Sequence, residues 1–173
     1  MSVRDPEAAF ALLERLGAPR RLVVHHTLVV EAARALLGEL ERYSGCFDAG
    51  LVLLGTALHD AGKILHPAEM DGPGHAHEEA GRGLLEAQGL RELARFCVSH
   101  AAWDAPDVPL EDLLVALSDK LWKGKRVAAL ERRVIEQLAA RAREDFWNVF
   151  MVADESFERV AAGADDRLSR SSG

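Results

Sequence analysis

The sequence of 173 residues is poor in cysteine and in aromatic residues, and it lacks the patterns typical of strands. Its two cysteines, Cys46 and Cys97, have no CxxC spacing. Neither a disulfide framework nor a thiolate metal site is therefore indicated, and both are expected to be buried or neutral filler. The chain has six Phe and one Tyr, and its β-branched residues never alternate in a run flanked by turn residues. These absences argue against a fold built on β-sheets.

Long apolar runs are missing as well. No stretch reaches the roughly 18 uninterrupted apolar residues of a membrane helix, and residues 1–6 lack the apolar core of a secretory signal. A cytoplasmic protein that does not enter a membrane is the expectation. Basic residues are outnumbered, because 21 Lys and Arg stand against 28 Asp and Glu, a net charge of −7. That balance disfavours a nucleic-acid polymer as partner but allows a small phosphorylated substrate, whose charge a metal and one lysine can match.

Helical periodicity, in contrast, runs along most of the chain. With 49% hydrophobic residues the chain can bury a real core. We predict an all-α fold, a compact helical bundle forming one domain over residues 1–164, followed by a flexible tail over 165–173. Residues 66–75 contain two prolines and two glycines and are predicted to be a loop. Helices are expected from Asp5-Pro6 to Gly17, from Pro19 to about Tyr43, and over 48–59, 77–88, 90–101, 110–123, 126–143 and 145–162.

The helix over 48–59 is expected to be central, because its run Leu51-Val52-Leu53-Leu54 is apolar on all sides. It ends at His59-Asp60, and Gly62 stands where a helix often needs a left-handed residue. An imidazole beside a carboxylate makes a plausible pair of metal ligands, better suited to Zn, Fe, Mn, Co or Ni than to calcium. A structural interpretation stays open, with His59 hydrogen-bonded in the core and Asp60 capping the next turn.

Further imidazoles and one carboxylate lie at other helix ends or faces. His25 and His26 each share an apolar face, so periodicity does not choose between them. Asp119 occupies the polar position of an apolar helix, where it either pairs with a neighbouring lysine or binds a cation. His77 begins a helix and His100 ends one, and each is also explained by a structural role. A helical protein can bring all of them to one point.

In this order the residues resemble the HD-domain metal-dependent phosphohydrolase superfamily. Its pattern is a His, an adjacent His-Asp pair and a distant Asp on a helical bundle. His25 is preferred to His26, because an apolar residue four positions on and small residues seven and eight positions on are common in the family. The resemblance covers about residues 20–125 and is carried by His25, by His59-Asp60 within Leu58-His59-Asp60-Ala61-Gly62-Lys63, and by Asp119 within Leu117-Ser118-Asp119-Lys120-Leu121.

Several members of the superfamily use two additional histidines to bind a second metal, which the Asp of the pair bridges. His77 and His100 occupy the corresponding places. The resemblance therefore implies one or two divalent ions, among Mn, Fe, Co, Ni, Zn and Mg. Many two-metal members have a His-His pair where this chain has Ser99-His100, so a single-metal site with His77 and His100 touching the substrate phosphate stays open.

The activity implied by the resemblance is hydrolysis of a phosphate ester of a nucleotide or another small phosphorylated metabolite by a metal-activated water. Asp60 and Lys63 would be the catalytic residues, with Lys63 either touching a phosphate oxygen or solvated at the surface. Glu78 and Glu79 are candidates for acid–base or supporting roles, although complementarity to a helix dipole explains them more simply. Two alternatives remain: a di-iron oxygenase on the same ligand set, and a non-catalytic nucleotide-binding regulatory domain.

Overall fold

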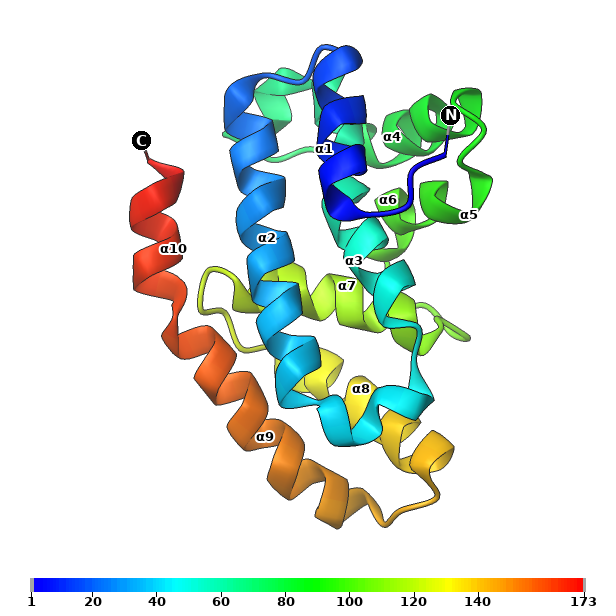
Figure 1. Cartoon of the computed structure of the whole chain (residues 1–173), viewed down its shortest axis with the longest axis vertical. Coiled ribbons are helices and arrows are strands. Elements are labelled where there is room, and N and C mark those ends of the chain that lie inside the picture. Colours follow the sequence, from blue (N-terminus) through cyan, green and yellow to red (C-terminus); the bar gives the residue numbers. More distant parts are fainter. Residues whose placement is uncertain (1, 173) are drawn as a thin grey trace.

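The computed structural model describes residues 2–172, and every regular element within them is a helix (Figure 1). The predicted all-α class is confirmed. The elements are α1 (Pro6–Arg15), α2 (Arg20–Glu39), the 3-10 helix η1 (Glu41–Cys46), α3 (Ala49–Leu58), the 3-10 helices η2 (Ala61–Ile64) and η3 (Pro67–Met70), α4 (Ala76–Ala87), α5 (Arg91–Ala94), α6 (Phe96–Ser99), α7 (Leu110–Leu121), α8 (Ala128–Ala142), α9 (Phe146–Ala162) and α10 (Ala164–Ser171).

Helices α2, α3 and α7 pack against one another at the centre of the bundle (Figure 1). Their apolar stripes are fully buried, as Val29 of α2, Val52 of α3 and Leu117 of α7 illustrate. Helix α1 covers α2 and α3, whereas α4, α5 and α6 pack together beside α3. Helices α8 and α9 close the other end. Burial of apolar surface thus fixes the three helices from which most of the predicted site residues project.

Side-chain caps determine where two of these helices begin. Asp5 accepts a hydrogen bond from the Ala8 N–H at 2.8 Å, and Asp48 accepts one from the Leu51 N–H at 3.0 Å. Both satisfy backbone donors that a first helical turn leaves free. Because Asp48 starts α3, the ten residues of that helix end directly before His59.

Some helix boundaries differ from those expected. The long helix expected to reach Tyr43 ends as an α-helix at Glu39 and continues as the 3-10 helix η1. The single helix expected over 90–101 is divided into α5 and α6 at Arg95, which keeps helical backbone angles (φ −60°, ψ −31°). The predicted loop over 66–75 contains the short 3-10 helix η3. These differences shift helix ends without moving the predicted site residues out of the bundle.

The segment 165–173, which the sequence predicts to be a flexible tail, is mostly helical in its described part, up to 172. Helix α10 occupies Ala164–Ser171 and packs against α2 (Figure 1). The buried guanidinium of Arg167 donates hydrogen bonds to the carbonyl oxygens of Trp122, Leu121 and Val160. A buried cation needs such partners, and here backbone carbonyls supply them. The polar composition of this segment concealed its attachment to the bundle.

The two cysteines are free thiols, as expected. Cys97 is buried and lies 3.5 Å from the carbonyl oxygen of Leu58, and burial raises the pKa of its thiol to about 12. Cys46 is half-buried. Among residues 2–172 no helix combines the length and the apolar character needed to cross a bilayer.

Candidate metal centre

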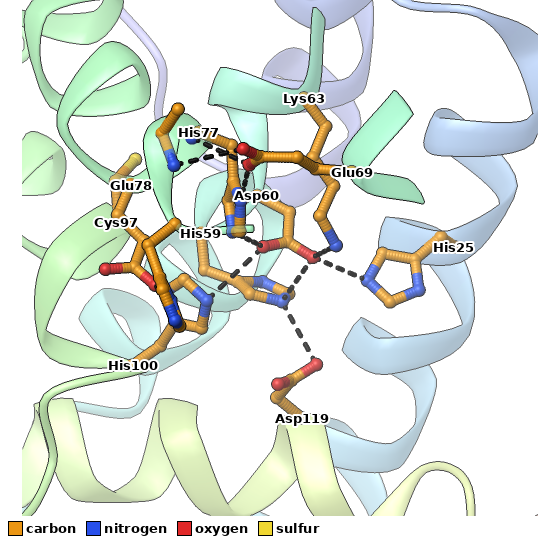
Figure 2. A network of polar contacts seen from close by, with 12 residues as sticks. His25, His59, Asp60, Lys63, Glu69, His77, Glu78, Cys97, His100 and Asp119 are labelled. Carbon is orange, nitrogen blue, oxygen red and sulfur yellow. Dashed lines mark hydrogen bonds and ion pairs between the residues drawn. The ribbon is translucent and has the colours of Figure 1, made fainter. Parts of the chain in front are cut away.

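Asp60 lies at the centre of a polar cluster inside the bundle (Figure 2). The residue is only 3% exposed. Its Oδ2 atom lies 3.1 Å from His25 Nε2 and 3.5 Å from His59 Nε2. Its Oδ1 atom lies 3.3 Å from the Nε2 atoms of both His77 and His100. The two oxygens of one carboxylate therefore face two different sets of imidazoles.

The first group consists of His25, His59, Asp60 and Asp119, whose ligand atoms all lie within 4.8 Å of one another. Helix α2 supplies His25, the end of α3 supplies His59 and Asp60, and α7 supplies Asp119. The Oδ1 atom of Asp119 lies 3.3 Å from His59 Nε2. Two imidazoles and two carboxylates form a nitrogen and oxygen set that suits divalent transition metals.

The second group consists of Asp60, His77 and His100, again with ligand atoms within 4.8 Å of one another and all three residues buried. His77 belongs to the first turn of α4, and His100 directly follows α6. Within the described chain, all six predicted ligands thus meet at one place (Figure 2). Whether they bind metal is a prediction that this geometry supports.

Gly62 explains why α4 comes so close to Asp60. A Cβ atom at this position would lie 1.7 Å from the carbonyl oxygen of His77 and 2.6 Å from the backbone nitrogen of Gly81. Only a residue without a side chain allows η2 and α4 to touch in this way. The expectation that Gly62 adopts a left-handed conformation is wrong, because its φ is not positive. The glycine is needed for a close approach between backbones.

Hydrogen bonds at Nδ1 orient two of the imidazoles. His59 Nδ1 lies 2.7 Å from the carbonyl oxygen of Thr56, and His100 Nδ1 lies 2.9 Å from that of Phe96. Because a carbonyl oxygen only accepts, both Nδ1 atoms donate. A proton on Nδ1 leaves Nε2, which faces Asp60, as the nitrogen that can bind a metal.

Glu69 orients the third imidazole and was not predicted. Its carboxylate lies 2.5 Å from His77 Nδ1 and accepts hydrogen bonds from the N–H groups of Ala76 and His77 at 3.1 and 2.9 Å. A carboxylate on the far nitrogen of a metal-binding histidine is a common supporting arrangement. Glu69 belongs to η3, in a segment rich in proline and glycine where periodicity carries no signal. Its proximity to His77 in sequence was the only available clue.

The structure also shows that His25 and the adjacent His26 have different environments. His25 is half-buried and faces Asp60, in agreement with the preference for it. His26 is fully buried, and its Nδ1 lies 3.3 Å from the carbonyl oxygen of Thr56 while its Nε2 has no hydrogen-bond partner. Burial, reinforced by the nearby His59 and His25 rings, lowers the pKa of His26 well below its usual value. His26 is therefore a neutral core residue.

The charge balance of the cluster fits a bound cation. Burial by itself would raise the pKa of Asp60, but the imidazoles of His59, His100, His25 and His77 outweigh it and hold that pKa well below normal. Burial likewise opposes ionisation of Asp119, and His59 outweighs it, so its pKa is also lowered. Both carboxylates are thus anionic. Asp60 Oδ1, although buried, has no hydrogen bond of good geometry, as expected of an oxygen that faces an ion.

Asp60 in turn affects the two histidines of the second group. The close contact with the Asp60 carboxylate raises the pKa of His77, with burial opposing it and Glu69 assisting. Burial would lower the pKa of His100, but the contact with Asp60 outweighs it and the pKa is raised. A metal ion at these two Nε2 atoms would therefore have to displace protons.

Of the other predicted candidates, Lys63 contacts the ligand Asp60, whereas Glu78 and Glu79 pair with residues outside both ligand groups. Lys63 Nζ lies 2.8 Å from Asp60 Oδ2 with its side chain only 18% exposed, so it is not a freely solvated surface lysine. Glu78 pairs with His75, and Glu79 pairs with Arg82. These partners belong to neither ligand group, which favours a structural role for both glutamates.

A family model described as the HD domain matches residues 23–122, which is more than half of the chain. The matched segment contains both ligand groups in full. Comparisons with curated proteins and with solved structures gave no match.

Proposed function

The chain belongs to the HD-domain family, whose members are generally metal-dependent phosphohydrolases, and we propose that it hydrolyses a phosphate ester of a nucleotide or another small phosphorylated metabolite. The observation that carries this proposal is the Asp60 carboxylate. Its two oxygens face two ligand groups that together supply imidazoles and carboxylates from five separate helical segments. Buried carboxylates need cationic partners, and a divalent ion held by these donors would supply the positive charge that Lys63 and the imidazoles otherwise provide.

In the proposed enzyme His25, His59, Asp60 and Asp119 hold one divalent ion, and His77, His100 and Asp60 hold a second. The donor set suits Mn, Fe, Co, Ni and Zn, and it also admits Mg. A bound ion lowers the pKa of a coordinated water and stabilises negative charge on the phosphoryl oxygens.

Lys63 is the residue best placed to bind the phosphate. Its ammonium group and His25 both line a cavity of about 540 Å³ beside the first ligand group. The volume is suited to one small molecule. A phosphate oxygen that enters this cavity meets the Lys63 ammonium, which exchanges part of its interaction with Asp60 for one with the substrate. Lys63 thereby positions the ester and offsets charge that builds up during hydrolysis.

The test combines metal analysis with an activity assay. Untagged protein is analysed for metal content and then assayed for phosphate release from a panel of nucleotides and small phosphate esters, with Mn, Co, Ni or Mg added. We expect turnover with at least one metal. Loss of bound metal and of turnover is expected in the His59→Ala/Asp60→Ala variant, with the helical circular dichroism retained.

The exposed His75 provides a matched control, because His75→Ala removes an imidazole near α4 without touching either ligand group. This variant should keep both metal and activity. Absence of phosphate release with every metal contradicts the proposal. Iron with an oxo-bridged absorption band would instead favour the di-iron oxygenase, and metal with ligand binding but no turnover would favour the regulatory domain.

A further inference from the structure

The cavity beside His25 extends outward from the first ligand group to the surface, and its lining is strongly cationic. Arg21, Lys63 and Lys123 are among the nine lining residues, and none of the nine is Asp or Glu. This is unusual for a chain with 28 acidic and 21 basic residues. The charged groups that line the cavity are thus all basic, although Arg21 pairs with Asp71 and Lys63 pairs with Asp60 just outside the lining, and a basic lining favours anionic ligands.

Two of these cations lie one helical turn outside the ligand group. Arg21 precedes His25 by four residues on α2, which corresponds to about 6 Å along the helix on the same face. Its side chain is 57% exposed, compared with 20% for His25. Lys123 follows Asp119 by four residues, lies in the turn two residues after the end of α7, and is exposed as well. Lys63 forms the inner end of the cavity, and Arg21 and Lys123 form its outer rim.

The outer cations are available to a ligand. Arg21 donates two hydrogen bonds to Asp71, but both side chains are largely exposed, so an incoming anion can exchange with Asp71 at the surface. Within the described residues Lys123 has no carboxylate partner. Lys63, in contrast, is held by Asp60 at 2.8 Å. The rim therefore contains two cations that an incoming anion can bind without breaking a buried ion pair.

Helix α10 completes the rim. Ser171 and Ser172 at its end line the cavity with uncharged hydroxyls. Arg167 fixes this helix to the chain next to Lys123, through hydrogen bonds of 2.8 and 3.1 Å to the carbonyl oxygens of Trp122 and Leu121. Helix α10 is thus attached to the end of α7, the helix that carries Asp119. This attachment fixes the shape of the outer cavity before a ligand binds.

We propose that Arg21 and Lys123 form a second anion-binding subsite, so that the substrate carries a second anionic group, a phosphate or a carboxylate, in addition to the ester phosphate. The inference rests on the proposed function, because the ester phosphate is taken to bind at Lys63. Arg21, Lys123 and the serines of α10 all lie outside the segment that matches the family, residues 23–122. The subsite is therefore a feature of this chain, beyond what the family match covers.

Two substrates that differ only in the second anion test the inference. Phenyl phosphate has one anionic group, and 4-carboxyphenyl phosphate has two. For the intact protein we expect kcat/KM to be higher for the carboxylated ester. In the Arg21→Gln/Lys123→Gln variant the ratio of the two kcat/KM values should fall about fivefold, mainly through KM, since an ion pair between exposed groups is worth up to about that factor.

The control is the Arg20→Gln/Lys125→Gln variant, which removes the same charge from neighbouring exposed positions. Arg20 lines a different cavity, beside Glu14, and Lys125 lines neither that cavity nor the one beside His25. The ratio should stay within twofold of that for the intact protein. An equal fall of the ratio in both variants would mean that only net charge matters, and it would refute the subsite. An unchanged ratio in Arg21→Gln/Lys123→Gln would refute it as well.

A binding measurement separates failure of the subsite from failure of the proposed function. Benzylphosphonate and 4-carboxybenzylphosphonate are not hydrolysed, and isothermal titration calorimetry gives their affinities for the same three proteins. Tighter binding of the carboxylated compound, lost in Arg21→Gln/Lys123→Gln alone, supports the subsite even when neither ester is turned over. Equal affinities, or no binding of either compound, overturn it.

Discussion

Replacement of Gly62 by alanine tests how the second ligand group is assembled. The added Cβ would lie 1.7 Å from the carbonyl oxygen of His77, whereas real Cβ atoms essentially never come closer than 3.0 Å. The two backbones must therefore separate by at least 1.3 Å, the difference between these values. Neither neighbour is a flexible side chain, so η2 and α4 have to move as units.

The expected cost of Gly62→Ala is at the upper end of the roughly 1–3 kcal/mol for overpacking, or above it. For a chain of this length that corresponds to a melting temperature lower by roughly 6–12 °C. The same displacement moves His77 away from Asp60 Oδ1, which it now approaches to 3.3 Å. Metal held by the second group should be lost before metal held by the first. Thermal unfolding without metal and titration with metal measure the two effects.

Gly83 gives the matched control, because it lies in the same helix α4 and a Cβ there meets nothing within 4 Å. Gly83→Ala should stabilise the protein by about 0.5–1 kcal/mol, as alanine does at an open helical site. The left-handed φ that would penalise alanine is absent at Gly62, so its cost is purely steric. Equal stability of the two variants, with equal metal binding, would refute the close-contact explanation.

Three further predictions concern the ligands and their protons. His25→Ala should weaken metal binding by at least about 100-fold, whereas His26→Leu should leave it unchanged. Equal losses of affinity in a metal titration of the two variants would contradict the assignment of His25 as the ligand. Glu69→Gln should weaken binding at the second group by about 10–100-fold with little change in the first. Without metal, the raised pKa values of His77 and His100 give stability that is full below about pH 6.5 and lost as the pH rises through the raised values. Chelated protein should therefore have a lower melting temperature at pH 8 than at pH 6, and metal affinity should increase over the same pH range. If neither the melting temperature nor the affinity changed between pH 6 and pH 8, the assignment of raised pKa values would be wrong.

The first ligand group was predicted through the resemblance to the HD-domain pattern, and its residues lie on or next to helices with strong apolar periodicity. His25 projects from α2, His59 and Asp60 end α3, and Asp119 projects from α7. The burial of these helices forces their polar residues toward one another. Periodicity still did not distinguish His25 from His26, since both faces of α2 are covered, one by the site and the other by the core.

Features that depend on contacts between distant segments were missed. Glu69 reaches His77 from a short 3-10 helix, and the sequence of that segment indicates only a loop. Gly62 was assigned a conformational role, although its importance lies in the approach of α4. Helix α10 was predicted to be flexible because most of its residues are polar, and only the fold reveals the three carbonyl oxygens that receive Arg167. None of these contacts leaves a periodic signal.

The cluster around Asp60 is balanced without metal, which explains how this fold tolerates so many buried polar groups. Lys63 lies on Oδ2, and the raised pKa values of His77 and His100 favour protons on the imidazoles that face Oδ1. Metal binding then replaces these protons and does not create order in an unfolded region. Removal of a metal should accordingly leave the fold intact, whereas removal of the carboxylate leaves one ammonium and several imidazoles without a counter-charge, a change that costs about 3–5 kcal/mol for a broken buried pair. The same carboxylate therefore counters the nearby positive charges in the metal-free protein and, in the proposed enzyme, lies between the two ligand groups.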